Sequence, residues 1–335
     1  MQKYYGGIDY LRIALSWAVV AWHMLIFGKS DIFSPEKYEE HVFGFSDLIN
    51  FHLLLLAVPT FIFISCFLFV DKNKDHKDLL KKVKKYFMLI SFWFFCWLIW
   101  RAAKGMEVPF TLNGMILGIL ITPYYFFLCL LFSLIITFFA MRISTRLNIL
   151  FLIISCLVLL TLPFVTILTG YINVSMYQNP LNFLLYPFGA IILSRIREKM
   201  DLRDRLLIAG GLIATGISLS LFEWKFEVDS IFFTTNGFAI PAYTRPSLFF
   251  FSAALMIFCL YIQPSTNRVI DFMSRLSLGL YCLHVFFMDW MVQVNFGGIP
   301  FEFNRAIQFL LLIAISYLVS ILMGIFVRKD LISTV

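Results

Sequence analysis

Ten long apolar segments dominate the sequence and constrain its fold more than any other feature. A helix of about 20 apolar residues can cross the hydrocarbon core of a bilayer, and 61% of the 335 residues are hydrophobic against 14% that are charged. We therefore predict an all-α fold, a polytopic membrane bundle of about ten transmembrane helices that forms one domain over residues 1–335. The predicted spans are 8–28, 47–70, 86–103, 123–141, 147–168, 180–194, 206–223, 243–262, 276–294 and 306–327. A shorter amphipathic stretch, 111–120, is expected to lie in the membrane interface.

This layout leaves no room for a sizeable soluble domain, which excludes a fused nucleotide-binding cassette, a soluble hydrolase or a DNA-binding module. All six cysteines lie inside apolar runs without a Cys-x-x-Cys pair, so neither a disulfide framework nor a metal site is expected. The first apolar run has no small-residue cleavage site after it, and we expect it to be retained as a membrane span.

The basic residues indicate the direction in which the chain crosses the membrane. If the N-terminus is cytoplasmic, 20 of the 27 Lys and Arg residues fall on cytoplasmic ends and loops, and 7 fall outside. The excess alternates loop by loop, as the positive-inside rule requires. We predict that both termini are cytoplasmic and that the protein is a multi-pass protein of the cell (plasma) membrane. The net charge of +7 then reflects topology, and no nucleic-acid partner is expected.

The first span contains ionisable residues, which are costly inside a membrane and mark functional sites by default. Arg12 and His23 are eleven residues apart, or three helical turns, so they share one helix face about 16 Å apart along its axis. Ser16 lies on the same stripe, and Asp9 lies one turn before Arg12. A plainer interpretation is that Arg12 reaches lipid headgroups and that His23 packs in the core.

The first two spans resemble those of integral membrane acyltransferase family 3, whose members acylate cell-surface glycans. The family's first span carries Asp-x-x-Arg, then ten residues and a His, here Asp9, Arg12 and His23. Its second span typically ends in a Phe-rich element with Ser-Gly, and this chain has Phe61-Ile-Phe-Ile-Ser65-Cys66, with Cys in place of Gly.

Two later elements are also similar to that family. Lys82-Val-Lys-Lys85, at the start of the third span, corresponds to an Arg-x-x-Arg pattern, and the change from Arg to Lys keeps the charge but loses the planar fork. The segment from Ser274 to His284 resembles a Ser-x-x-Ser-Tyr-x-x-Tyr-x-x-His element of the ninth span. A His and a Trp that often precede the fourth span are missing here.

The resemblance implies transfer of an acyl group, with acetyl as the expected one, from cytoplasmic acyl-CoA to a hydroxyl of an extracytoplasmic or lipid-linked glycan. Acyl-CoA is then a donor substrate rather than a permanently bound cofactor, and its phosphates would be held by Arg12, Lys82 and Lys85. Most of the lysines from Lys72 to Lys85 are also explained as a topology signal that contacts membrane lipids.

The resemblance also implies that His23 and Asp9 belong to the catalytic site. His23 would act either as general base on the acceptor hydroxyl or as a transient carrier of the acyl group, and the sequence leaves both open. The expected substrate-binding residues are Ser16, Ser277, Tyr281 and His284. For His284, core packing is an equal alternative.

The acceptor side is less well defined by the sequence. The predicted outer loops 29–46 and 223–245 contain carboxylates and aromatics, which suit sugar binding but are also typical of any solvated loop. His52, near the outer end of the second span, has a weaker claim to function. The main alternative to an enzyme is a carrier or flippase that exports a lipid-linked glycan. The lack of repeat symmetry and the histidine aligned above a cation disfavour that alternative.

Overall fold

The computed structural model describes residues 5–28, 45–72, 75–109, 111–169, 177–228, 243–265, 267–294, 296–297, 300–326 and 331. These residues form helices and no strands, which confirms the predicted all-α class. In chain order the helices are α1 (Gly6–Met24), α2 (Phe45–Leu48), η3 (Ile49–Leu53), η4 (Leu54–Leu56), α3 (Ala57–Asp71), α4 (His76–Ala103), α5 (Leu112–Ile121), α6 (Tyr125–Ala140), α7 (Thr145–Thr169), η6 (Pro180–Phe183), α8 (Leu185–Ile196), η7 (Arg197–Lys199), α9 (Leu202–Val228), α11 (Pro246–Tyr261), α12 (Arg268–Gln293) and α13 (Phe301–Phe326).

Each of the ten predicted spans corresponds to one helix or to a run of consecutive helices. Six of the described helices are long and apolar enough to cross a membrane, and a seventh span results if the α5–α6 pair, bent by 80°, counts as one. The six are Phe45–Asp71, His76–Ala103, Thr145–Leu162, Leu202–Glu223, Arg268–Gln293 and Phe303–Phe326. Helix α11 is apolar but has only 16 residues, and α8 has 12. The count of about ten spans therefore stays a prediction, and so does the location of the termini.

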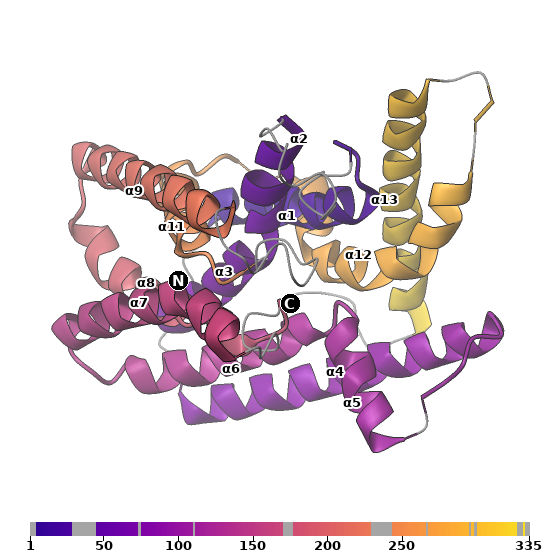
Figure 1. Cartoon of the computed structure of the whole chain (residues 1–335), viewed down its shortest axis with the longest axis horizontal. Coiled ribbons are helices and arrows are strands. Elements are labelled where there is room, and N and C mark those ends of the chain that lie inside the picture. The colour runs from indigo at the N-terminus through magenta and orange to yellow at the C-terminus, as the bar shows by residue number, and fades with distance from the viewer. Residues whose placement is uncertain are drawn as a thin grey trace.

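Helices α1 and α3 form the centre of the bundle. Helix α3 packs against α1, α6, α8 and α11, and Figure 1 shows it in the middle of the molecule. Its sequence is apolar on all faces, which is the pattern of a helix surrounded by other helices. Helix α1 packs against α12, α3, α11 and α13. The first part of the polar stripe, from Asp9 to Ser16, thus lies against other helices, whereas His23 remains exposed.

Helices α1 and α12 run in the same direction. Near their N-terminal ends Asp9 contacts Ser274, and further along both helices His23 contacts His284. The first and ninth of ten alternating spans must cross the membrane in the same sense, so this arrangement agrees with the predicted topology.

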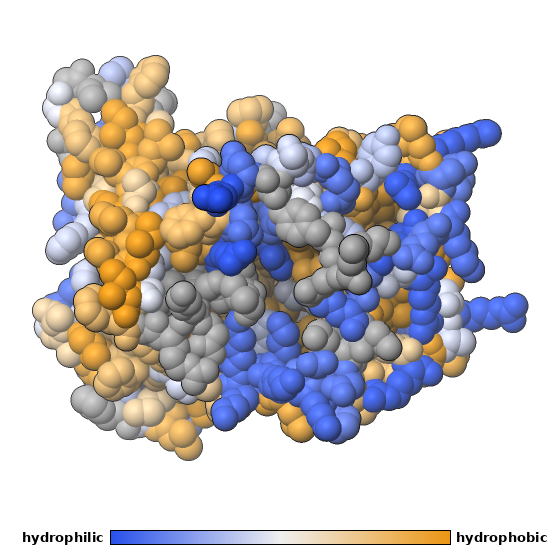
Figure 2. Space-filling view, turned by 180° about the vertical axis from the view of Figure 1, so that it is seen from behind, coloured by the Kyte–Doolittle hydropathy of each residue, from blue (hydrophilic) through white to orange (hydrophobic). Residues whose placement is uncertain are grey.

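Two basic turns lie together at one edge of the molecule. The turn from α6 to α7 and the turn from α8 to α9 are both at the left of Figure 1. Arg195 joins α8 to the first of these turns, because its guanidinium donates to the Met141 carbonyl at 2.9 Å and to the Ile143 carbonyl at 3.0 Å. Figure 2, which reverses the view, shows hydrophilic residues gathered toward the corresponding right-hand edge.

Arg197 holds together the ends of α1, α3 and α8. Its guanidinium donates to Asp71 and to the Tyr5 hydroxyl, and it lies 5.1 Å from the centre of the Phe67 ring. The Tyr5 hydroxyl in turn donates to Asp71 at 2.9 Å. Burial raises the pKa of Tyr5 to about 12, so this phenol keeps its proton and remains a donor. These contacts fix the chain immediately before Lys72.

The predicted sidedness is testable by cysteine labelling. Lys199, in η7, and Glu107, after α4, are both exposed and belong to regions predicted to lie on opposite faces of the membrane. In intact cells an impermeant thiol reagent should label Glu107→Cys, and it should label Lys199→Cys only after permeabilisation. The parent chain, whose six cysteines are buried or half-buried, is the control. Labelling of both variants from the same side would contradict the topology.

Candidate active site

The α1–α12 contact begins at a buried carboxylate. The Ser274 hydroxyl donates to Asp9 Oδ1 at 2.7 Å, and an Arg12 guanidinium nitrogen lies 3.7 Å from the same oxygen. Asp9 and Ser274 are buried, whereas Arg12 is half-buried. Asp9 lies about 21 Å from His23 along α1, since fourteen residues separate them at 1.5 Å each. The structure therefore places Asp9 where it orients Arg12, and it does not bring Asp9 to His23.

Arg12 opens onto a cavity of about 330 Å³ between α1, α3, α4, α6 and α12. Four cationic side chains line it, those of Arg12, Lys72, Lys82 and Lys85. Lys82 and Lys85 are one turn apart on α4 and half-buried, whereas the neighbouring lysines at positions 81 and 84 are exposed. The structure thus brings together the three residues that the sequence predicted to bind the donor.

The deeper wall of the cavity is largely aromatic. Phe61, Phe126, Phe127 and Tyr281 line it, and Ser277 contributes a small polar side chain. The Tyr281 hydroxyl donates to the Pro123 carbonyl at 2.7 Å, and the Ser277 hydroxyl donates to the Ser274 carbonyl at 2.8 Å. Cations therefore gather where α4 begins, and apolar surface follows along α12.

Two histidines lie beyond this wall. The ring centres of His23 and His284 are 5.1 Å apart, and the Tyr281 ring centre is 6.0 Å from that of His284. His284 is 0% exposed, whereas His23 is exposed. Positions 277, 281 and 284 are spaced by four and three residues, so one face of α12 leads from the cavity to the histidine pair.

Ser16 stands apart from these groups. Its hydroxyl donates to the Ile13 carbonyl of the same helix at 2.8 Å, and the side chain is fully buried. It is not among the described residues that line the cavity. Most of the two predicted outer loops, 29–46 and 223–245, lies outside the described residues, so sugar binding there stays a prediction.

Comparison with known families identifies the class of the protein. The profile of acyltransferase family 3, described as an acyltransferase domain, matches residues 5–325, which is essentially the whole chain. The chain belongs to acyltransferase family 3. The resemblance predicted from four short elements is thereby confirmed, and the protein is a membrane acyltransferase. No curated protein and no solved structure matches it significantly.

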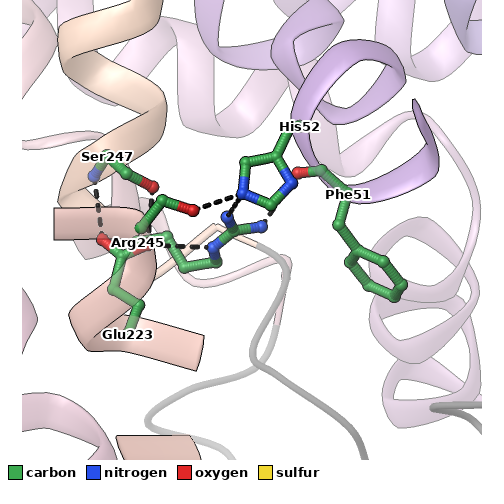
Figure 3. A network of polar contacts seen from close by, with 6 residues as sticks. Phe51, His52, Glu223, Arg245 and Ser247 are labelled. Carbon is green, nitrogen blue, oxygen red and sulfur yellow. Dashed lines mark hydrogen bonds and ion pairs between the residues drawn. The ribbon is translucent and has the colours of Figure 1, made fainter. Parts of the chain in front are cut away.

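The acyltransferase contains a second polar cluster that sequence reasoning interpreted wrongly. Glu223 and Arg245 are the first and last residues of the predicted outer loop 223–245, for which sugar binding and a plain solvated loop were both open, but their exposed fractions are 5% and 1%. Arg245 Nε donates to Glu223 Oε2 at 3.1 Å, and another guanidinium nitrogen donates to the Phe51 carbonyl at 2.8 Å (Figure 3). The pair is buried because α9 continues past Glu223 and packs closely against α11, which begins directly after Arg245. Opposite charges at neighbouring ends of two apolar spans were the available signal.

This cluster joins three parts of the acyltransferase. Glu223 also accepts hydrogen bonds from the Ser247 backbone N–H at 2.8 Å and from the Ser247 hydroxyl at 2.5 Å. His52 Nε2 contacts the Ser220 hydroxyl and lies 3.2 Å from the Arg245 guanidinium. His52 belongs to η3, a π-helical turn of the kind that often occurs at functional sites.

The same turn reaches the neighbourhood of the histidine pair. Phe51, whose carbonyl accepts from Arg245, packs edge-to-face on Trp22 with ring centres 5.6 Å apart. Trp22 directly precedes His23. The Glu223–Arg245 pair thus holds Phe51 in place against Trp22, and through Trp22 it positions the helix segment that carries His23.

We expect the Glu223–Arg245 pair to be strongly coupled. Glu223→Gln and Arg245→Met should each cost about 3–5 kcal/mol, because each leaves the other charge buried without compensation. The double variant should lose clearly less than the sum, and thermal unfolding of purified protein measures all three. Asp271→Asn, which breaks an exposed pair with Arg275, is the control and should cost at most about 1 kcal/mol. Additive losses at Glu223 and Arg245 would contradict the coupling.

Proposed function

We propose that the acyltransferase moves an acyl group, expected to be acetyl, from acyl-CoA to a hydroxyl of an extracytoplasmic or lipid-linked glycan. The observation that carries this proposal is the path along α12, from a cavity lined by four cations to the exposed imidazole of His23. Membership of acyltransferase family 3 supports acyl transfer over the carrier alternative.

The cavity suits a CoA thioester. Phosphates form their strongest hydrogen bonds with charged donors, and Arg12, Lys82 and Lys85 converge from two helices. The aromatic surface deeper in the cavity provides apolar contact for the thinner arm that carries the acyl group. The predicted topology places the cationic end on the cytoplasmic side, where acyl-CoA occurs. Asp9 and Ser274 hold Arg12 in place, and Ser277 and Tyr281 line the route of the arm.

His23 lies where an acceptor hydroxyl can meet the thioester. It is exposed and about 16 Å along α1 from Arg12. As general base, its imidazole removes the hydroxyl proton, the oxygen attacks the thioester carbonyl, and the carbon–sulfur bond breaks. As acyl carrier, the same imidazole first takes the acyl group and then passes it to the hydroxyl. Both routes require that the donor thioester and the acceptor hydroxyl each reach His23, together in the first route and one after the other in the second.

Donor binding should depend on two lysines and not on their neighbours. Lys82→Gln/Lys85→Gln should weaken acyl-CoA binding at least about 30-fold, because each of the two lost charged contacts contributes about 1–3 kcal/mol. Lys81→Gln/Lys84→Gln removes the same charge from exposed positions of the same helix and is the matched control. Equilibrium binding to purified protein measures both. Equal affinity of the two double variants would show that Lys82 and Lys85 do not bind the donor and serve only as a topology signal.

Transfer should depend on His23 while donor binding does not. His23→Ala should lose about 100- to 10,000-fold in the rate of glycan acylation, the contribution expected of a general base. Its affinity for acyl-CoA should stay near that of the wild type, because the phosphates bind three turns away. The control is His76→Ala, which changes the exposed first residue of α4. A folded His23→Ala protein that keeps a third of the wild-type activity would show that His23 is neither the general base nor the acyl carrier. Wild-type protein that consumes no acyl-CoA would favour the carrier.

A further inference from the structure

His284 is an anomaly among the buried residues. Its side chain is 0% exposed, and within the described part of the chain neither ring nitrogen has a hydrogen-bond partner. The backbone carbonyls of Leu280 and Tyr281, one turn earlier, lie near the ring but outside hydrogen-bonding geometry. A buried polar group without a partner costs free energy, and such exceptions in native proteins call for an explanation.

The position of His284 suggests a function that accounts for the free-energy cost of its unpartnered ring nitrogens. Its ring lies close both to Tyr281, which lines the cavity, and to His23, with ring centres 6.0 Å from the first and 5.1 Å from the second. The rings of His284 and His23 are tilted by 36°, and only His23 is exposed. One histidine is therefore accessible, and the other is enclosed next to a residue that lines the cavity.

The proposed reaction needs a proton at two separate places. The acceptor hydroxyl loses a proton as its oxygen attacks, and the sulfur of CoA gains one as it leaves, because an alkyl thiol is protonated at neutral pH. His23 can take the first proton. Tyr281 is not the donor of the second, since its hydroxyl is already donated to the Pro123 carbonyl at 2.7 Å.

We propose that His284 is a second catalytic residue, the general acid that protonates the departing sulfur of the donor thioester. This inference rests on the proposed function. The acceptor O–H bond breaks and its proton moves to His23, the new C–O bond forms, and the C–S bond breaks with its electron pair on sulfur. His284 gives the N–H proton of one ring nitrogen to that sulfur and takes the proton of His23 on the other. Both histidines are then neutral again, and His284 carries its proton on the nitrogen that received it from His23.

This relay accounts for both unpartnered nitrogens. A relay needs one ring nitrogen directed to the sulfur and the other to His23, so a fixed hydrogen bond to the protein at either nitrogen would block it. Enclosure of the ring keeps bulk water from supplying the proton instead. A histidine that served packing alone would gain from a hydrogen bond at one nitrogen at least.

The test compares two donors that differ in the leaving group. One is acetyl-CoA, and the other is the acetyl thioester of 4-nitrothiophenol, whose aromatic thiolate leaves without a proton. With acetyl-CoA, His284→Gln should lose about 100-fold in transfer rate, whereas with the aromatic thioester it should stay within about threefold of the wild type. His23→Ala should be defective with both donors, because removal of the acceptor proton is still required.

The controls separate chemistry from packing. Cys282→Ala alters the buried face of the same helix, and any loss it causes should be equal for the two donors. Equal losses for His284→Gln with the two donors, or no loss with acetyl-CoA, would overturn the proposal. If His284→Gln does not fold, or if the wild type does not accept the aromatic thioester, which lacks the CoA phosphates, His284→Ala with acetyl-CoA and added imidazole replaces the comparison. No recovery of transfer in a folded protein would then also overturn the proposal. Wild-type protein that transfers acetyl from neither donor would refute the proposed function itself.

Discussion

The hydrogen bond from Ser274 to Asp9 sets the register between α1 and α12, and the site depends on that register. It is buried, it involves a charged acceptor, and such bonds are stronger than neutral ones. With Asp9 and Ser274 opposed and the helices running the same way, His284 arrives beside His23 three to four turns later. A shift of one residue on either helix would turn His284 away from its partner, because successive residues are separated by 100° around the axis.

The two polar clusters of the protein are built on different physical terms. The Glu223–Arg245 cluster is closed, since its charges neutralise each other and a serine and a backbone carbonyl complete the hydrogen bonds. The histidine pair is different, because both ring nitrogens of the buried His284 lack a hydrogen-bond partner among the described residues. A closed cluster fixes geometry, and an open one leaves atoms available for a substrate. Phe51 and Trp22 connect the two, so the rigid cluster supports the neighbourhood of the reactive one.

Much of this arrangement was predictable from sequence because it depends on helix periodicity. The apolar segments specified the helices, and the spacing of Lys82 and Lys85 placed both on the cavity side of α4. The contact between Asp9 and Arg12 follows from their spacing of one turn. The assignment of Asp9 to the catalytic site came from the resemblance, which groups it with His23 although the helix rise separates them. Glu223 and Arg245 lie 22 residues apart across a region read as a loop, so their pairing depends on the packing of α9 on α11. The unpartnered nitrogens of His284 depend on every neighbour of the ring, which a single sequence does not specify.

The proposed function requires a site that is reached from both faces of the membrane and that still blocks the passage of ions. The Tyr281 ring lies 5.2 Å from the Phe126 ring and 6.2 Å from the Phe127 ring, and the bond from its hydroxyl to the Pro123 carbonyl fixes it there. These rings form a barrier between the cationic cavity and the histidines, and hydrated ions would have to shed their water to pass it. In the proposed reaction, only the narrow, uncharged end of the donor has to enter this barrier, while its phosphates stay on the side from which they came. In the proposed reaction the acyl group would thus pass outward and one proton would pass inward on the departing thiol, without an open path for hydrated ions.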